Sequence, residues 1–263
     1  MRHTLSSVYD ELYQAHLHAF QKRRRDTYGQ HHFYTDFYPS IGVPKDKPVD
    51  LLVYGQAVGG WLPELDYRQP LPAGHMQESR DYSNDPGNPH TPLDWVNLMW
   101  SKYVADEHAD RRKAHVDRYG DYSPSRSFFW QVTTYFMQQK FALAPNDWSW
   151  AERVVWSNLY KIAPQKGKWH PNPSDEDCVL QRPECVRLVE LELQELKPTY
   201  CLVLTNDEWW AHFRTGLRTT EVARPEDSPV QSVEQFGATR IVVTKRPYVG
   251  RYKEHVQRIL ECL

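Results

Sequence analysis

The stretch VDLLVYGQAVGGW, residues 49–61, decides the fold class of this protein. Its apolar part, residues 49–54, has the length and composition of one buried strand. The strand leads directly into a turn with three glycines, Gly55, Gly59 and Gly60, where the backbone can approach a ligand closely. A buried strand that opens onto a glycine-rich turn is typical of an α/β sheet with a ligand site at its edge.

Further apolar runs and helical patterns alternate along the chain. The other predicted strands are residues 154–156, 200–204 and 239–244. Helical spacing of apolar residues predicts helices over residues 4–25, 92–103, 126–141, 183–196, 208–217 and 252–263. Because strands and helices alternate, we expect a three-layer α/β/α fold around a central, mainly parallel sheet of four strands.

The chain length of 263 residues suits a single domain. We expect residues 1–47 to form an N-terminal helical extension of that domain. Residues 62–94 are rich in Pro, Asp, Asn and Gly and have no sustained period, which predicts a long, irregular insertion loop. The polar interval 106–125 is a second candidate insertion.

Composition limits the function classes. A net charge of -2 argues against a protein that coats nucleic acid by charge alone, although it permits a local basic groove. The 10 Trp and 16 Tyr exceed what such a chain usually carries, and aromatic rings both fill cores and stack on unpaired bases. There is no apolar N-terminal segment and no stretch of bilayer-spanning length, so we expect a cytoplasmic protein without a membrane partner. We also expect a monomer.

The sequence carries no metal or cofactor signature. The four cysteines are Cys178, Cys185, Cys201 and Cys262. They include no CxxC pair, which favours free, buried thiols over a zinc or iron–sulfur site. The 12 His are scattered, and His31-His32 is their only adjacent pair. The turn after residue 54 lacks the GxGxxG spacing of a dinucleotide site, so we expect neither a metal nor a nucleotide cofactor.

Three segments directly follow predicted strands, and ligands of open α/β sheets bind at the carboxyl ends of strands. These segments are residues 55–61, 156–161 and 245–251. The second contains Asn158, whose amide offers one acceptor and two donors and can read the edge of a pyrimidine-like base. Most turn asparagines cap backbone groups instead. The third segment combines basic residues, a proline and a tyrosine, which suits contact with a phosphodiester.

Four features follow one another in a distinctive order. A strand precedes GQ-x-x-G, a later apolar strand precedes Asn, a helix ends in ELKP before another apolar strand, and a last strand precedes a basic-x-P turn. This ordered set resembles the uracil-DNA glycosylase superfamily. The segments VVWSNLYKI and LELQELKPTYCLVLT are similar to its divergent bacterial members. The resemblance covers residues 48–255 and is specific as a set, although each motif alone is weak.

The resemblance implies that the protein flips a nucleotide out of DNA and that water cuts its N-glycosidic bond. It implies that Gln56 lines the base pocket and supplies a backbone donor, and that Asn158 reads the base edge. The other pocket residues that it implies are Gly55, Ala57, Gly59 and Trp61. The phosphate-binding residues that it implies are Arg246, Tyr248 and Arg251. Donors and cations placed in this way act where charge develops in the transition state.

The chain departs from the uracil-specific branch at three places. Ala57 stands where that branch has an Asp that positions water. Val58 and Gly59 replace a proline and the tyrosine that rejects 5-substituted pyrimidines. Arg246 matches the catalytic His, and an arginine can stabilise an anion but cannot shuttle a proton at neutral pH. The water-positioning acid is therefore missing and the gate of the pocket is open.

Other residues could replace the missing chemistry. Glu64 and Asp66 lie just beyond the first motif, and Asp66 is our third catalytic candidate beside Gln56 and Asn158. Lys161 could instead attack the sugar as an amine and give a lyase activity. That reaction requires a lowered pKa, and a salt-bridged or exposed lysine is the competing interpretation.

The open gate at Gly59 and the insertion at residues 62–94 favour a roomy pocket. We therefore expect a DNA glycosylase for a bulky modified pyrimidine, such as glucosylated 5-hydroxymethylcytosine of phage DNA, that leaves an abasic site and serves antiviral defence. One alternative is a uracil or deaminated-base repair glycosylase. Another is a non-catalytic DNA-binding module, for which the missing Asp and His are the main argument. A doubly wound fold with a small-nucleotide ligand ranks last because the motifs occur in the order of the family.

Overall fold

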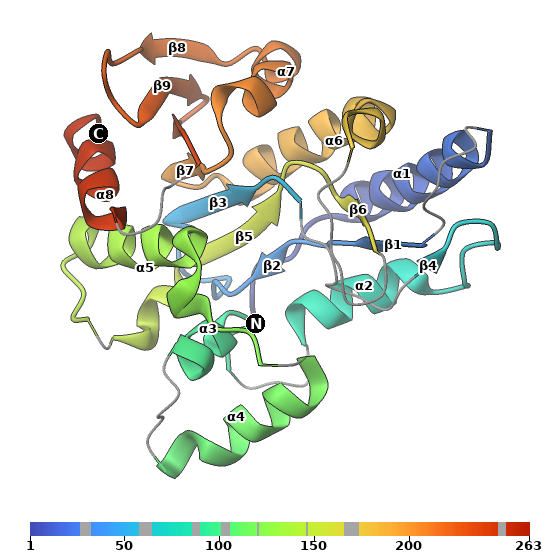
Figure 1. Cartoon of the computed structure of the whole chain (residues 1–263), viewed down its shortest axis with the longest axis horizontal. Coiled ribbons are helices and arrows are strands. Elements are labelled where there is room, and N and C mark those ends of the chain that lie inside the picture. Colours follow the sequence, from blue (N-terminus) through green and yellow to red (C-terminus); the bar gives the residue numbers. More distant parts are fainter. Residues whose placement is uncertain are drawn as a thin grey trace.

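A computed structural model of the chain describes residues 1–26, 33–57, 65–85, 90–100, 106–119, 121–145, 147–165, 174–246 and 251–263. The large central sheet has seven strands in the order β2-β5-β3-β7-β10-β9-β8 (Figure 1). A smaller sheet has three strands in the order β4-β1-β6. The fold of the described residues is therefore mixed α/β.

Four neighbouring strands at the centre of the large sheet run parallel to one another. They are β5 (Val154–Asn158), β3 (Leu51–Gly55), β7 (Tyr200–Val203) and β10 (Thr239–Thr244). These are the four strands that the apolar runs predict, and their prediction is confirmed. Gly55 is the register partner of Asn158, so the ends of β3 and β5 lie side by side.

Antiparallel strands extend this parallel centre on both sides. They are β2 (Ser40–Ile41), β9 (Val230–Phe236) and β8 (Thr220–Ala223). The sheet is thus mixed and has seven strands, whereas the sequence analysis predicts four. All four residues of β8 are exposed, and β9 interleaves Gln and Glu with its valines, so neither strand shows the apolar run of a buried parallel strand.

Helices cover both faces of the large sheet, as alternate residues of β3 show. Leu52 and Tyr54 pack into one core cluster with α1 (Ser7–Asp26), α6 (Asp175–Leu196) and α7 (Asp207–Leu217). Leu51 and Val53 pack into the other with α3 (Asp94–Trp100), α5 (Phe128–Lys140) and α8 (Tyr252–Glu261). In Figure 1, α6 and α5 lie on opposite sides of β3 and β5.

The prediction of an irregular loop at residues 62–94 is wrong for the part of this range that the structure describes. That part contains β4 (Leu65–Asp66) and the ten-residue helix α2 (His75–Asn84). The buried side of α2 consists of His75, Ser79 and Ser83, at helical spacing but without apolar residues. Hydrophobic periodicity therefore could not reveal this helix. The polar interval 106–125 likewise contains a helix, α4 (Asp106–Tyr119).

The small sheet joins three distant segments. Strand β1 (Phe33–Asp36) pairs antiparallel with β4 and with β6 (Ile162–Pro164). Helix α6 starts at Asp175, eight residues before the predicted start at residue 183. A capping box between Ser174 and Asp177 begins the helix, and Pro183 lies inside it. No helix of the described ranges has the length and apolar character that crossing a membrane requires.

Candidate functional site

The ends of β3 and β5 form a rigid corner at the carboxyl edge of the large sheet. The Leu159 N–H donates to the Gly55 carbonyl at 2.9 Å, and the Tyr160 N–H donates to the Gln56 carbonyl at 2.9 Å. These two bonds continue the parallel pairing beyond Asn158. The structure thus brings Gly55, Gln56 and Asn158 together, in the place where α/β sheets bind ligands.

Asn158 is the most informative residue of this corner. Its side chain is 1% exposed, and neither Oδ1 nor Nδ2 has a hydrogen-bond partner among the described residues. A buried polar group without a partner costs about 1–3 kcal/mol. Such a group at the carboxyl edge of the sheet points to a ligand that supplies the missing donor and acceptor.

Gly55 makes room for this amide. A Cβ at Gly55 would lie 2.6 Å from Oδ1 of Asn158 and 3.6 Å from Cε2 of Phe129. Only glycine therefore lets the Asn158 side chain lie over the end of β3. Because Leu51 and Val53 face the core that includes α5, Gly55 faces the same side, and so does the amide.

Phe129 of α5 is the aromatic neighbour of this corner. Its ring is half-buried and lies next to the space over Gly55, and its centroid is 6.1 Å from that of Trp156. An aromatic ring beside an unpaired amide can stack on a planar ligand while the amide reads the edge of that ligand. In the sequence, Phe129 is marked only as part of the predicted helix over residues 126–141, because its proximity to Gly55 arises from tertiary packing.

A buried ion pair lies behind Asn158. Lys161 Nζ donates to the Asn158 carbonyl at 2.6 Å, to Ser157 Oγ at 2.7 Å and to Glu192 Oε1 at 2.6 Å. Both charged side chains are fully buried. The Lys161 ammonium therefore has three acceptors and no exposed surface, which favours the salt-bridged interpretation over an attacking amine.

Glu192 ties this ion pair to the neighbouring elements. Its carboxylate also accepts from Tyr9 Oη at 2.6 Å and from Tyr54 Oη at 2.8 Å. Tyr54 directly precedes Gly55, so the α6 carboxylate holds the end of β3 and, through Lys161, the end of β5. Burial and the nearby Glu192 charge raise the pKa of both tyrosines, which keeps them as neutral donors.

The other predicted pocket residues are only partly described. Gln56 and Ala57 are half-buried, and Ala57 packs against the core cluster on the α6 side of the sheet. Gly59, Trp61 and Glu64 lie outside the described residues.

Asp66 lies in the small sheet rather than at the corner. It belongs to β4, and its carboxylate accepts from the Arg68 guanidinium, with Nη2 at 2.7 Å from Oδ2. Register partners on β1 place Asp66 opposite Phe33, whereas Ile162, next to Lys161, is opposite Asp36. Three residues of strand separate these positions, about 10 Å along β1. The structure therefore gives Asp66 an ion-pair partner of its own and does not bring it to Asn158.

The predicted phosphate-binding residues belong to the segment of the chain between β10 and α8. Arg246 is exposed just after β10, and its backbone N–H donates to Asn206 Oδ1 at 2.5 Å. Arg251 is exposed and precedes α8, with its Nε 4.0 Å from Glu254. Tyr248 lies outside the described residues. Because β10 is two strands from β3, Arg246 leaves the sheet about 10 Å from Gly55, at the same edge.

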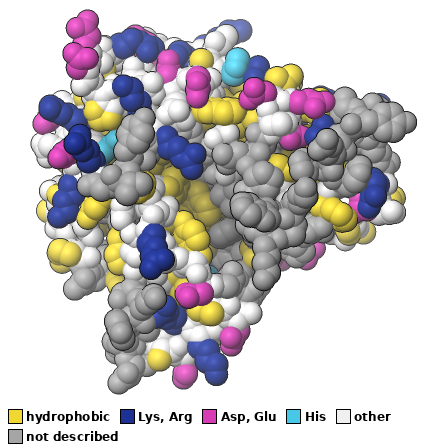
Figure 2. Space-filling model, in the orientation of Figure 1, with side chains coloured by type: hydrophobic (Ala, Val, Ile, Leu, Met, Phe, Trp, Pro, Cys, Tyr) yellow, Lys and Arg dark blue, Asp and Glu magenta, His cyan; other side chains and the backbone are white. Residues whose placement is uncertain are grey.

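One face of the molecule combines hydrophobic and basic side chains. Figure 2 shows a hollow with hydrophobic side chains in it and Lys and Arg side chains beside it. In α8, burial lowers the pKa of His255 to about 4, so its ring is neutral at pH 7. Within the described ranges, no cluster of three His, Cys, Asp or Glu is placed to hold a metal ion. The four cysteines are free thiols.

The fold is mixed α/β, and the corner with the Asn158 amide, at the carboxyl edge of its parallel strands, is a candidate ligand site. In comparisons with known proteins, no family model and no curated protein matches the chain.

Proposed function

We propose that this protein is a DNA glycosylase that holds an extruded base against Asn158 and cuts its N-glycosidic bond. The buried amide of Asn158, which has no hydrogen-bond partner among the described residues, is the observation that carries the proposal. One acceptor and two donors on a rigid strand end complement the alternating donors and acceptors on the edge of a pyrimidine. Phe129, beside the same space, supplies a face on which the base can stack.

The four central parallel strands support the proposal at the level of the fold. The segments that follow β3, β5 and β10 leave the sheet at one edge, because these strands run in the same direction. The ELKP sequence precedes β7 and so lies at the opposite edge. The strand ends carry Gln56 and Asn158 on one side and Arg246 on the other. A base at Asn158 and a flanking phosphate at Arg246 would then lie about 10–15 Å apart, two to three strand spacings.

The chemistry that we propose is hydrolysis. The bond between C1′ of the sugar and the base nitrogen breaks, the water oxygen bonds to C1′, and a water proton passes to the departing base or to solvent. Asn158 Nδ2 is a donor toward an oxygen of the base on which negative charge develops. Arg246 stabilises negative charge near the phosphates, and as a permanent cation it transfers no proton.

The substrate that we propose is a bulky modified pyrimidine, such as glucosylated 5-hydroxymethylcytosine of phage DNA, and the role is antiviral defence. The support for a roomy pocket is in the sequence: Gly59 stands where the uracil-specific branch has its tyrosine, and residues 62–94 are a long insertion. The uracil or deaminated-base repair enzyme remains the alternative that the same site can serve.

A panel of DNA substrates tests the proposal. Duplexes with uracil, cytosine, 5-hydroxymethylcytosine or its glucosylated form are incubated with the protein and treated with alkali, which breaks the strand at abasic sites. Breaks only at the glucosylated base support the modified-base glycosylase, and breaks only at uracil assign the repair enzyme. Asn158→Ala should abolish breaks, whereas Gln194→Ala removes an exposed amide of α6 and should leave them unchanged.

A non-catalytic DNA-binding module is a second candidate, and Ala57 and Arg246 favour it. Neither residue can orient water or shuttle a proton in the way that an Asp or a His would. Intact strands on every DNA of the panel, together with DNA binding that Arg246→Ala weakens, would assign this function instead.

A further inference from the structure

Asn206 has a strained backbone at the carboxyl edge of the large sheet. It follows β7, and its φ of 98° and ψ of 153° lie in a region that is essentially restricted to glycine. Its N–H donates to the Thr244 carbonyl at the end of β10 at 3.0 Å. Its Oδ1 accepts from the Arg246 N–H at 2.5 Å. Asn206 therefore contacts the chain on both sides of residue 245.

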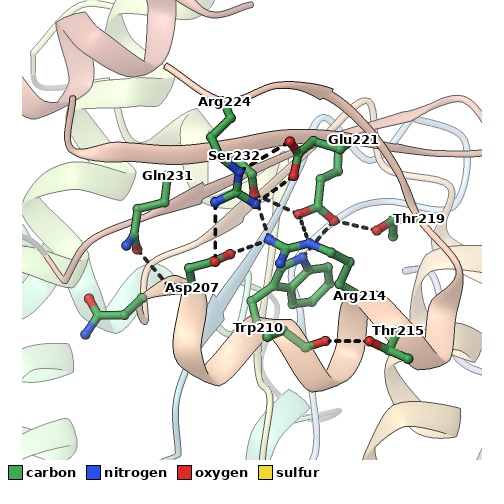
Figure 3. Close-up of polar contacts among 12 residues, drawn as sticks. Asp207, Trp210, Arg214, Thr215, Thr219, Glu221, Arg224, Gln231 and Ser232 are labelled. Atoms are coloured by element: carbon green, nitrogen blue, oxygen red, sulfur yellow. Dashed lines mark hydrogen bonds and ion pairs between the residues drawn. The ribbon is translucent and has the colours of Figure 1, made fainter. Parts of the chain in front are cut away.

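An ion-pair network holds the residue that follows Asn206. Figure 3 shows Asp207 between Arg214, Arg224 and Gln231. The Asp207 N–H donates to Gln231 Oε1 at 2.8 Å, and its carboxylate accepts from Arg214. Arg224 Nη1 lies 3.5 Å from the same carboxylate.

The network is anchored in the interior of the protein. Arg214 Nε donates at 2.7 Å to Glu234, which is fully buried in β9 and also accepts from Trp210 Nε1 at 2.9 Å. Strained conformations persist only where the surrounding structure determines them in several ways. This network holds the first residue of α7 and can therefore maintain the strained backbone of Asn206, which precedes it.

The Asn206 side chain contacts the first turn of α7 through Nδ2, which lies 3.5 Å from Glu208 Oε1. It makes no capping hydrogen bond to α7. Its oxygen instead accepts from Arg246, which is the first exposed arginine after β10. The hydrogen bond from the Arg246 N–H thus joins Asn206, at the start of α7, to the residue that we propose for phosphate contact.

We infer that Asn206 is a positioning residue: its side-chain oxygen sets the direction in which Arg246 leaves β10 toward a DNA phosphate. The inference rests on the proposed DNA-binding function. It predicts that DNA affinity depends on the acceptor oxygen of Asn206, whereas the stability of the fold depends on the strained backbone.

Two substitutions separate these effects. Asn206→Gly removes both the oxygen and the strain, and Asn206→Ala removes the oxygen but keeps the strain. The probe is a short duplex with one tetrahydrofuran abasic-site analogue, which permits binding without base excision, and fluorescence anisotropy gives the affinity. Both variants should bind about threefold to tenfold more weakly, the effect of one lost hydrogen bond. The Tm of Asn206→Gly should equal or exceed that of the unchanged protein, whereas that of Asn206→Ala should fall.

A double-substitution cycle shows whether Asn206 acts through Arg246. In an Arg246→Ala background, Asn206→Gly should cause no further loss of affinity. Ala142→Gly is the matched control, because Ala142 also has a positive φ, of 52°, but follows α5 next to Phe141. Phe141 contacts Arg153, which pairs with Asp50 before β3, so this control lies at the opposite end of the strands. It should leave affinity unchanged.

The outcomes distinguish the inference from the proposed function. If Arg246→Ala weakens binding and Asn206→Gly does not, the positioning role is wrong and DNA binding stands. If affinity falls in Asn206→Ala but not in Asn206→Gly, binding follows stability and the role of the oxygen is likewise refuted. A protein that does not bind the probe at all, or an Arg246→Ala variant with full affinity, overturns the proposed phosphate site and the inference with it.

Discussion

Lys161 Nζ lies 2.6 Å from Glu192 Oε1, and neither side chain is exposed to solvent. Because the same ammonium binds the Asn158 carbonyl and the same carboxylate binds Tyr54, this one pair joins α6 to the ends of two parallel strands. The geometry of the candidate site therefore depends on a charge pair that no ligand needs to touch.

Breaking this pair should be strongly destabilising. Lys161→Met leaves the Glu192 carboxylate buried without its cation, and we expect a loss of about 3–5 kcal/mol in the free energy of unfolding. Glu192→Gln leaves the Lys161 ammonium without its anion and should have a similar cost. Urea unfolding of both variants and of the double variant measures the coupling. Single losses below about 1 kcal/mol, the range of a surface pair, would contradict the buried interaction.

Gly55→Ala should disable the site because the added Cβ displaces the amide. That Cβ would lie 2.6 Å from Oδ1 of Asn158, too close for both groups to remain. We expect loss of base excision, or of binding to the abasic analogue, in a protein that still unfolds cooperatively. Gly216→Ala is the control, because its Cβ would contact Val186 between α7 and α6. It should lower stability and leave excision intact, and the same pattern in Gly55→Ala would refute the role of Gly55.

Phe129→Leu should weaken binding of an extruded base while it keeps most of the apolar volume. Base–aromatic stacking contributes about 1–3 kcal/mol per base, so affinity should fall by roughly tenfold or more. Phe141→Leu changes the same side chain at the other end of α5, next to Arg153, and should leave affinity unchanged. Equal effects of the two substitutions would show that the Phe129 ring acts only through helix packing.

Acid should destabilise the protein through His16. Burial, and to a lesser extent the nearby Lys161 and Arg23 charges, lower the pKa of His16 from 6.5 to about 4. Between these values the unfolded chain binds a proton that the folded chain refuses, so stability falls as pH drops from 6.5 to 4. The loss approaches about 3 kcal/mol for this one group. His16→Gln should flatten the dependence of Tm on pH, and an unchanged dependence would contradict this role of His16.

His75 should show the opposite sign. Burial opposes protonation of its ring, but the hydrogen bond and charge of Asp36, 2.7 Å away, outweigh burial with help from Glu78 and raise the pKa. This contribution to stability is fully present below pH 6.5 and is lost as pH rises through the raised pKa. In an NMR titration, Asp36→Asn should lower the pKa of His75. An unchanged pKa would mean that Asp36 does not anchor α2 through this pair.

Hydrophobic pattern located much of the fold. The runs at residues 49–54, 154–156, 200–204 and 239–244 all lie in strands of the sheet, because a buried parallel strand must be apolar on both faces. The pattern failed for α2, whose inward side is polar and bonds to Asp36, and for the exposed edge strand β8. Asp36 lies 39 residues before His75, and every residue of β8 is exposed, so neither element has a local apolar period.

By itself, the sequence determined where the central strands lie and that Gly55, Gln56 and Asn158 stand at strand ends, since burial and turn chemistry are properties of neighbouring residues. Only the tertiary structure decided that the Asn158 amide is buried with no partner in the described part of the chain, that Phe129 lies beside it and that Asp66 pairs with Arg68. It also decided that Lys161 meets Glu192, 31 residues away, and that Arg246 meets Asn206, 40 residues away. Such contacts depend on how separate elements pack, and the spacing of residues along the sequence does not predict that packing.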